Sequence, residues 1–394
     1  MGFLDLFSAA SMPVLKVLLV TGLGSFLAME SVDILGPTTR KLVNNLVFFV
    51  FNPALVGSNL ASTITLETIK IMWFMPINIL LTFVIGSALG WVLMLIAKPP
   101  QHLKGLILGT CAGGNLGNMP LIIIPAVCKE SGSPFGDPNV CNDHGVAYAS
   151  LSMAVGAVFL WSYVYNLVRI FAKDSSNKET LAVTAQEDLT QALLPSSTSA
   201  TDSEGKAKVM FNGMKQRLGK FVQRINLKAI FAPSTSGAIV GFFIGTIPLM
   251  RNLLIGTTAP LRVIQDSAVL VGDAAIPVVT LIVGGNLLKG LKGSSSGISL
   301  KIVLGIAAVR YIFLPLFGIV IVKSAHHYGL VNSDPLYLFV LLLQFALPPA
   351  MNISTIVQLF GAGESDCSVI MLWTYSLASI SLTLWSTFFM WLVG

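Results

Sequence analysis

The sequence GGNLGNMP at residues 113–120 interrupts an otherwise apolar segment of the chain. A second interruption, QFALPPAMN at residues 344–352, lies inside another apolar segment nearer the C-terminus. Glycine and proline destabilise the interior of a helix, and a mid-helix proline costs about 3 kcal/mol. Each segment is therefore predicted to form two short helices joined by an unwound stretch. We expect the unwound part of the first to be Asn115–Asn118, with the next helix beginning at Pro120.

The two interruptions occupy matching positions in two halves of the chain. Pro120 and Pro348 are separated by nearly the same number of residues as Asn59 and Asn286, which lie in the similar sequences GSNL and GGNL. Matched breaks of this kind are typical of secondary transporters, whose substrate site lies where the helices are broken.

The composition predicts a membrane protein. Hydrophobic residues make up 54% of the 394 residues, charged residues make up 11%, and the mean hydropathy is +0.80. Soluble domains carry about 25% charged residues. A membrane-spanning helix needs about 20 apolar residues. Ten transmembrane helices are predicted, near residues 10–29, 38–60, 70–97, 103–127, 145–170, 229–250, 262–288, 300–323, 335–360 and 367–393.

A polar segment divides these spans into two groups of five. Residues 172–228 are rich in Ser, Thr, Lys, Asp and Glu, and such a composition cannot bury enough apolar surface to fold. We expect a largely disordered loop between a first five-helix repeat, residues 1–171, and a second, residues 229–394. Because five is odd, the second repeat is inverted in the membrane, which gives an all-α 5+5 inverted repeat.

The distribution of charge sets the orientation. Most of the 24 Lys and Arg residues fall on one side of the predicted spans, chiefly in the central loop and its flanks. The positive-inside rule places that loop in the cytosol and both termini on the opposite side. The net charge of +6 then reflects topology and contact with anionic lipid. No nucleic-acid partner is expected.

The breaks themselves predict a site for an anion. The helix after each break presents free N–H groups and a partial charge of about +0.5, and an inverted repeat directs both ends to the membrane midplane. Amide side chains add donors, and neither break holds a carboxylate, which favours a neutral or anionic substrate over a cation. The candidate substrate-binding residues are Asn115, Asn118, Pro120, Gln344, Pro348, Pro349, Asn352 and Ser354.

Four other polar residues within the spans are candidates for supporting roles. Asn59 and Asn286 either join helices to one another or reach the substrate. Asp273 and Arg310 are charged residues well inside predicted spans. We expect these two to form a structural ion pair, and proton coupling through Asp273 is the alternative.

The cysteines predict one disulfide and no metal site. Cys128 and Cys141 flank a turn-rich loop on the predicted non-cytosolic side, where disulfides persist. The spacing of His and Cys matches no metal-binding motif. The spans contain neither an acid dyad nor a Ser/His pair, so we expect no metal, no cofactor and no enzymatic activity.

Several motifs together resemble those of a known family. They are GNLGNMP at residues 114–120, the Pro348-Pro349 break, NPAL at residues 52–55, and the loop from Cys128 to Gly136. With five spans on each side of a cytosolic loop, they resemble the plant PIN-LIKES (PILS) auxin carriers, which belong with the PIN auxin efflux carriers. The resemblance covers nearly the whole chain.

The resemblance implies a carrier of indole-3-acetic acid in the endoplasmic reticulum membrane, with lumenal termini and a role in intracellular auxin homeostasis. It also implies a fold like that of bile-acid and sodium–proton transporters, in which two broken helices cross and a transport domain moves against a scaffold. Asn115, Asn118 and Asn352 would then contact the substrate carboxylate. A homodimer is among the expected assemblies. The loop is much shorter than in plasma-membrane PIN carriers, which argues against direct efflux from the cell.

The main alternative is a sodium-coupled organic-anion symporter of the bile-acid-transporter type. Such a carrier needs a cage of ligands for the cation, whereas the two breaks offer amides and carbonyls but no acid. A receptor that keeps the fold without transporting is a second alternative, which flux measurements distinguish from a carrier.

Overall fold

The computed structural model describes residues 15–16, 18–129, 133–172, 233–292, 298–361 and 363–394. Within these ranges the regular structure is helical, apart from one isolated bridge between two residues. The predicted loop at residues 172–228 lies outside the described residues except for Ala172, as does the beginning of the predicted span at residues 10–29.

The first half of the chain forms α-helices and two π-helical turns in its described part. They are α2 (Pro37–Leu46), η1 (Val47–Phe51), α3 (Asn52–Thr63), α4 (Leu66–Ile71), α5 (Phe74–Ala97), α6 (Gln101–Ala112), α7 (Asn118–Lys129), α8 (Pro138–Phe159) and η2 (Leu160–Val164).

Those of the second half, after residue 232, include both parts of the second broken segment. They are α12 (Pro233–Thr246), α13 (Pro248–Leu254), α14 (Arg262–Asp273), α15 (Ala275–Lys292), α16 (Leu300–Ala308), η3 (Val309–Phe313), α17 (Leu314–His327), α18 (Pro335–Ala346), α19 (Asn352–Phe360) and α20 (Glu364–Val393).

The lengths and the apolar composition of these helices are those of a multi-pass membrane protein. In the described part, six helical segments are long and apolar enough to cross a membrane, or seven if α12 and α13, which meet at an angle of 100°, count as one span. The six are Pro37–Thr63, Phe74–Ala97, Pro138–Ala172, Arg262–Asn286, Leu300–His327 and Glu364–Val393. The count of ten spans stays a prediction. The sequence predicted one continuous span at residues 229–250, whereas the structure has a bend between Thr246 and Pro248.

Both predicted interruptions are present. In the first, α6 ends at Ala112 and α7 begins at Asn118; in the second, α18 ends at Ala346 and α19 begins at Asn352. The prediction that α7 begins at Pro120 is wrong by two residues. Pro120 lies in the first turn of α7, where a missing N–H leaves no helical hydrogen bond unmade.

Two π-helical turns occur just before prolines. The turn η1 precedes Pro53 by two residues, and η3 precedes Pro315 by two residues. A proline cannot donate a main-chain hydrogen bond and crowds the carbonyl of the preceding turn. A locally widened turn accommodates this, and η3 contains Arg310.

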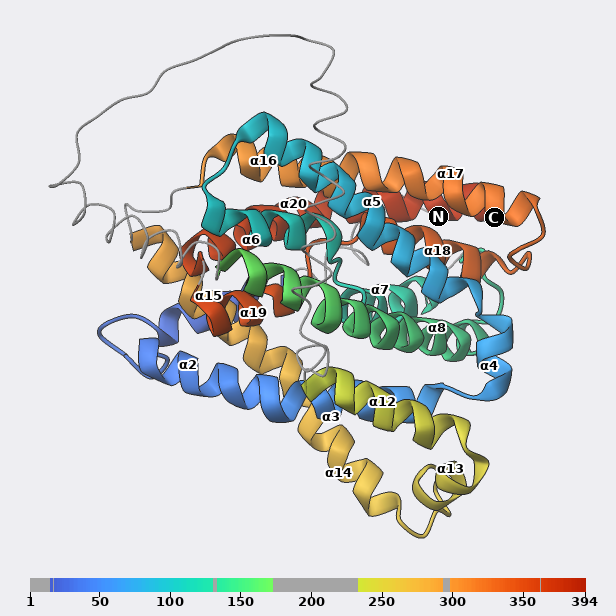
Figure 1. The fold of residues 1–394 in the computed structure, drawn as a ribbon. Coiled ribbons are helices and arrows are strands. Elements are labelled where there is room, and N and C mark those ends of the chain that lie inside the picture. Colours follow the sequence, from blue (N-terminus) through green and yellow to red (C-terminus); the bar gives the residue numbers. More distant parts are fainter. Residues whose placement is uncertain (1–14, 17, 130–132, 173–232, 293–297, 362) are drawn as a thin grey trace, which may run out of the picture.

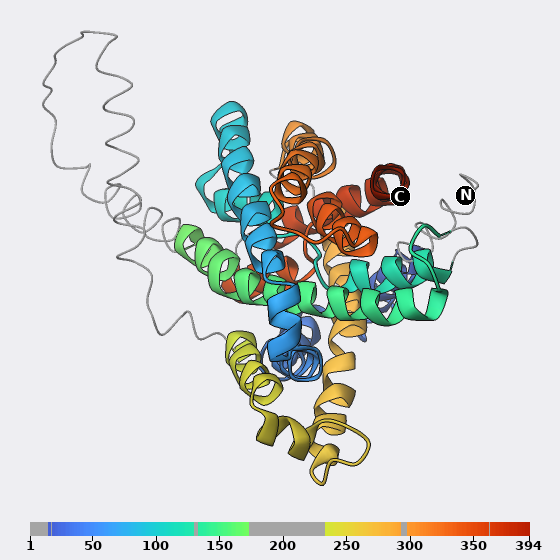
Figure 2. The same ribbon diagram turned by 90° about the vertical axis from the view of Figure 1, so that its right-hand side faces the viewer.

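Helices α2, α3, α12 and α14 form the lower part of the molecule in Figure 1, and α5, α16, α17, α18 and α20 form the upper part. The view turned by 90° shows the same division (Figure 2). Helix α3 packs on both α12 and α14 although they are distant in sequence.

Glycines bring α3 and α12 into direct backbone contact. A Cβ atom at Gly241 would collide with the carbonyl oxygen of Gly57, and one at Gly237 would collide with that of Pro53. Close approach of small residues is the usual way in which helices associate in lipid, where burial of apolar surface gives no driving force between them. The glycines therefore allow α3 and α12 to pack closely.

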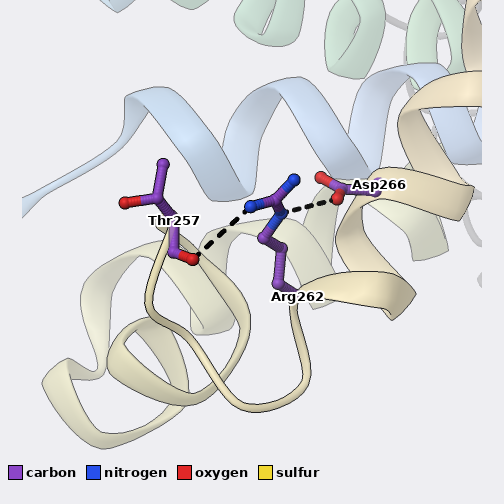
Figure 3. Close-up of polar contacts among 3 residues, drawn as sticks. All are labelled: Thr257, Arg262 and Asp266. Carbon is purple, nitrogen blue, oxygen red and sulfur yellow. Dashed lines mark hydrogen bonds and ion pairs between the residues drawn. The ribbon is translucent and has the colours of Figure 1, made fainter.

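A charged pair marks the beginning of α14. Nε of Arg262 donates to the Asp266 carboxylate at 2.8 Å, and Nη1 donates to the carbonyl of Thr257 at 3.4 Å (Figure 3). Both charged side chains are at least half exposed. Water and salt screen exposed pairs of this i,i+4 type, so this one contributes little to stability.

Candidate functional site

The two breaks meet and hydrogen-bond to each other through their main chains. Gly114 and Pro349 form an antiparallel bridge. The N–H of Asn115 donates to the carbonyl of Pro348 at 2.8 Å, and the N–H of Ala350 donates to the carbonyl of Gly113 at 2.9 Å. Unpaired backbone groups are costly in lipid, and these two hydrogen bonds satisfy part of the backbone that each break frees. We call the contact of residues 113–117 with residues 347–351 the crossover.

A tyrosine from α20 links the side chain of one break to the backbone of the other. Nδ2 of Asn115 donates to the hydroxyl of Tyr375 at 2.8 Å, and that hydroxyl donates to the carbonyl of Pro349 at 2.9 Å. Both side chains are buried. The Asn115 amide therefore helps to hold the crossover.

A small cavity of about 50 Å³ lies against the crossover. Its polar lining comes from Asn52, Asn115 and Asn352, and its apolar walls come from α3, α8, η2 and α15. None of the described residues that line it is a carboxylate. The cavity is large enough for a few water molecules and is too small in this conformation for a bicyclic acid, since ligand sites usually measure about 300 Å³ or more.

Asn52 is the lining residue with an unsatisfied polar atom. Its side chain is 2% exposed, and its Nδ2 has no hydrogen-bond acceptor in the described part of the molecule. A buried amide N–H without an acceptor costs about 1–3 kcal/mol. An oxygen atom of a bound ligand in the cavity would remove this cost.

The structure brings only part of the predicted binding set to the cavity. Asn115 and Asn352 line it, and Pro348 and Pro349 shape the crossover beside it. The side chain of Asn118 lies outside what the structure describes.

Gln344 and Ser354 lie elsewhere and make structural hydrogen bonds. Gln344 accepts from Nδ2 of Asn78 at 2.8 Å and donates to Oγ of Ser152 at 3.1 Å, which ties α18 to α5 and α8. The hydroxyl of Ser354 donates to the carbonyl of Met351 at 2.8 Å within its own turn. Neither lines the cavity.

The four residues predicted to support the site do not line the cavity. Asn59 donates to the carbonyl of Leu55 within α3, and Asn286 is buried in α15 away from the cavity lining. The expected ion pair of Asp273 with Arg310 is wrong. Asp273 is exposed at the end of α14, whereas Arg310 is buried and donates to main-chain carbonyls at the crossover. The carbonyl ends of two broken helices supply acceptors that the sequence did not reveal.

Sequence reasoning missed Asn52 and Tyr375 as residues of the site. Asn52 immediately precedes Pro53 in the middle of a span. An asparagine close to a proline within an apolar segment also occurs at both breaks, so this pattern could have pointed to Asn52. Nothing in the local sequence around Tyr375 points to the crossover, because its contacts come from the packing of α20.

A disulfide fixes the junction between α7 and α8. It joins Cys128 and Cys141, whose Cα atoms are 5.5 Å apart. The side chain of Asp137 accepts hydrogen bonds from the N–H groups of Asn139 and Val140 and so caps the N-terminus of α8. Cys111 and Cys367 are free and buried.

Comparison with known proteins identifies the family. The model of the family described as membrane transport protein matches residues 9–386. PIN-LIKES 1 of Arabidopsis thaliana is 54% identical over 394 residues, which cover 100% of this chain and 81% of that protein. PIN-LIKES 3 of the same plant is 54% identical over 99% of both chains. This chain is a PIN-LIKES membrane transport protein. PIN-LIKES 2, at 30% identity over 96% of this chain, is a more distant member of the same group.

Membership of the PIN-LIKES family makes the cavity at the crossover a candidate for the transport site. A chain of this family is a transporter in a lipid membrane, and a polar cavity at matched helix breaks is where a transporter holds a small molecule. The described lining of this cavity in the PIN-LIKES chain contains three asparagine amides and no acid.

Proposed function

We propose that this protein carries auxin, indole-3-acetic acid, across the endoplasmic reticulum membrane and so regulates intracellular auxin homeostasis. The observation that supports this most is the cavity at the crossover, with amide donors from Asn52, Asn115 and Asn352 and no acid in its described lining. A carboxylate accepts hydrogen bonds from such amides, and the apolar walls suit an aromatic ring.

The proposed binding geometry uses both broken helices. The carboxylate lies between the N-termini of α7 and α19, where the helix dipoles favour negative charge. The amides of Asn115 and Asn352 donate to it, with Asn118 as a further donor. Pro120, Pro348 and Pro349 keep the breaks open. The indole ring then lies against α3, α8 and α15.

The proposed transport mechanism is alternating access within a ten-span 5+5 inverted repeat. The cavity is lined by residues of α3, α8, η2, α15 and the crossover. A movement of these helices relative to the crossover would widen the cavity toward either face of the membrane. The proposal includes lumenal termini, a cytosolic central loop and a homodimeric assembly. Protease added to sealed microsomes should cut the loop, and protection of the loop would reject this orientation.

Uptake by proteoliposomes tests the substrate and its coupling. The full chain, reconstituted and supplied with radiolabelled indole-3-acetic acid, should take it up without a sodium gradient. A membrane potential should drive the anion, since 100 mV is worth about 2.3 kcal/mol per charge. Absence of uptake under every gradient would reject the carrier. Uptake abolished when potassium replaces sodium would instead favour the sodium-coupled organic-anion symporter.

The role of the crossover amides has its own test. A hydrogen bond to a charged group contributes roughly 1.5–3 kcal/mol, so Asn115→Ala should weaken binding about tenfold to a hundredfold. Asn59→Ala is the matched control, because Asn59 donates within its own helix. Wild-type affinity in Asn115→Ala at equal expression would remove Asn115 from the site.

A further inference from the structure

Arg310 is a fully buried arginine whose hydrogen-bond acceptors lie in both broken segments. Its Nε donates to the carbonyl of Leu347 at 2.9 Å, and Nη2 donates to the same oxygen at 2.5 Å. Its Nη1 donates to the carbonyl of Cys111 at 3.1 Å and to that of Ala112 at 3.4 Å. Nη2 also lies 3.3 Å from the carbonyl of Pro348. One guanidinium group thus joins the two breaks.

These oxygens belong to the C-terminal ends of α6 and α18. The last carbonyls of a helix have no partner within the helix, and together they carry a charge of about −0.5. Two such ends meeting in a buried place would repel each other. The guanidinium satisfies carbonyls of both ends at once and neutralises their combined charge.

Among the described residues that line the cavity, no acid neutralises the opposite ends of the crossover. Helices α7 and α19 begin beside the cavity with partial charges of about +0.5 each, and none of the described lining residues is an acid. The unpartnered Nδ2 of buried Asn52 lies in the same lining. With Arg310 present, the crossover therefore keeps a net positive charge that a single carboxylate would balance.

Gly114 provides the space that Arg310 occupies. A Cβ atom at position 114 would collide with Nη2 of Arg310. At the neighbouring Gly113, a Cβ atom would meet the end of the Leu160 side chain at 3.1 Å, the carbonyl oxygen of Gly109 at 3.2 Å and the end of the Ile353 side chain at 3.5 Å. These contacts are wider than the collision at Gly114, and Arg310 can avoid that collision only by giving up its carbonyl acceptors, so alanine at position 113 is a matched control for alanine at position 114.

We propose that Arg310 is a positioning residue that clamps the C-terminal ends of α6 and α18 together and makes the adjoining cavity prefer anionic over neutral ligands. The second part rests on the proposed function, because it assumes that the cavity binds the transported acid.

Two ligands that differ in charge test the preference. Indole-3-acetic acid and its neutral amide, indole-3-acetamide, have nearly the same size and shape. In Arg310→Gln we expect the affinity for the acid to fall about tenfold while that for the amide changes by less than about threefold. Arg310→Lys keeps the charge but loses the forked geometry, so it should keep the wild-type ratio of the two affinities. An equal loss of affinity for both ligands in Arg310→Gln would overturn the proposed preference for anions.

A ligand-free measurement tests the clamp and separates it from the proposed function. Hydrogen exchange of the full chain in detergent should become at least tenfold faster at residues 111–117 and 345–351 in Gly114→Ala, and stay unchanged there in Gly113→Ala. Equal exchange in the two alanine variants would overturn the clamp. Because Gly114→Ala retains the arginine, this pair also serves if Arg310→Gln fails to fold. If the wild type binds neither ligand, the proposed function and the anion preference fail, while hydrogen exchange still decides the clamp.

Discussion

The main-chain N–H of Asn115 donates a 2.8 Å hydrogen bond to the carbonyl of Pro348, a residue from the other half of the chain. This bond joins two helix breaks that the sequence places more than half the chain apart. The hydroxyl of Tyr375 and the guanidinium of Arg310 then bind the same pair of breaks from two further helices. Hydrogen bonds from three sources therefore hold the crossover together, and we expect changes in the shape of the cavity to come from movement of the helices around it.

Removing the amide of Asn52 should weaken substrate binding without destabilising the protein. Its Nδ2 is buried without an acceptor, so Asn52→Ala removes an unsatisfied donor from the ligand-free state. It also removes a donor to the bound carboxylate, and the affinity should fall about tenfold or more. Equilibrium binding of indole-3-acetic acid measures the effect, with Asn59→Ala as the control. An unchanged affinity would mean that Asn52 does not face the ligand.

Removing the hydroxyl of Tyr375 should loosen the crossover. Tyr375→Phe deletes the hydrogen bonds to Asn115 and Pro349, each contributing about 0.5–1.5 kcal/mol. The apparent melting temperature in detergent should fall. Tyr328→Phe, at a residue that is 76% exposed, should leave it unchanged. Equal melting temperatures for the two variants would show that the hydroxyl of Tyr375 does not stabilise the crossover.

Adding a methyl group to the contact between α3 and α12 should destabilise the protein. In Gly241→Ala the new Cβ atom would collide with the backbone oxygen of Gly57, and overpacking of this kind costs about 1–3 kcal/mol. Gly22→Ala is the control, since no atom lies within 4 Å of its added Cβ position. Thermal stability of both variants in detergent is the measurement. A melting temperature of Gly241→Ala equal to that of the control would show that the helices separate easily.

The disulfide predicts a particular count of reactive thiols. The chain has 4 cysteines, and Cys128 and Cys141 are bonded to each other. The denatured protein should add two maleimide–polyethylene glycol groups without reductant, at Cys111 and Cys367, and four after reduction. Gel mobility reports the count. Four additions without reductant would exclude the bond in the purified protein.

Hydropathy and the positions of proline and glycine were enough to predict a helical membrane protein with two broken segments. The physical reason is that these features act locally. An apolar run of sufficient length has to be helical in lipid, and GGNLGNMP or LPP ends a helix whatever surrounds it. Asn115 lines the cavity for the same reason, because it lies within the break itself.

Tertiary packing alone decided which side chains line the cavity and which hold the crossover. Gln344 lies only a few residues before the second break, yet it turns toward Asn78 and Ser152. Arg310 is paired with carbonyl groups rather than with Asp273, because the ends of α6 and α18 supply a concentration of unpaired acceptors beside it. These partners lie on different helices. Their meeting depends on how the helices pack, which neither composition nor local pattern contains.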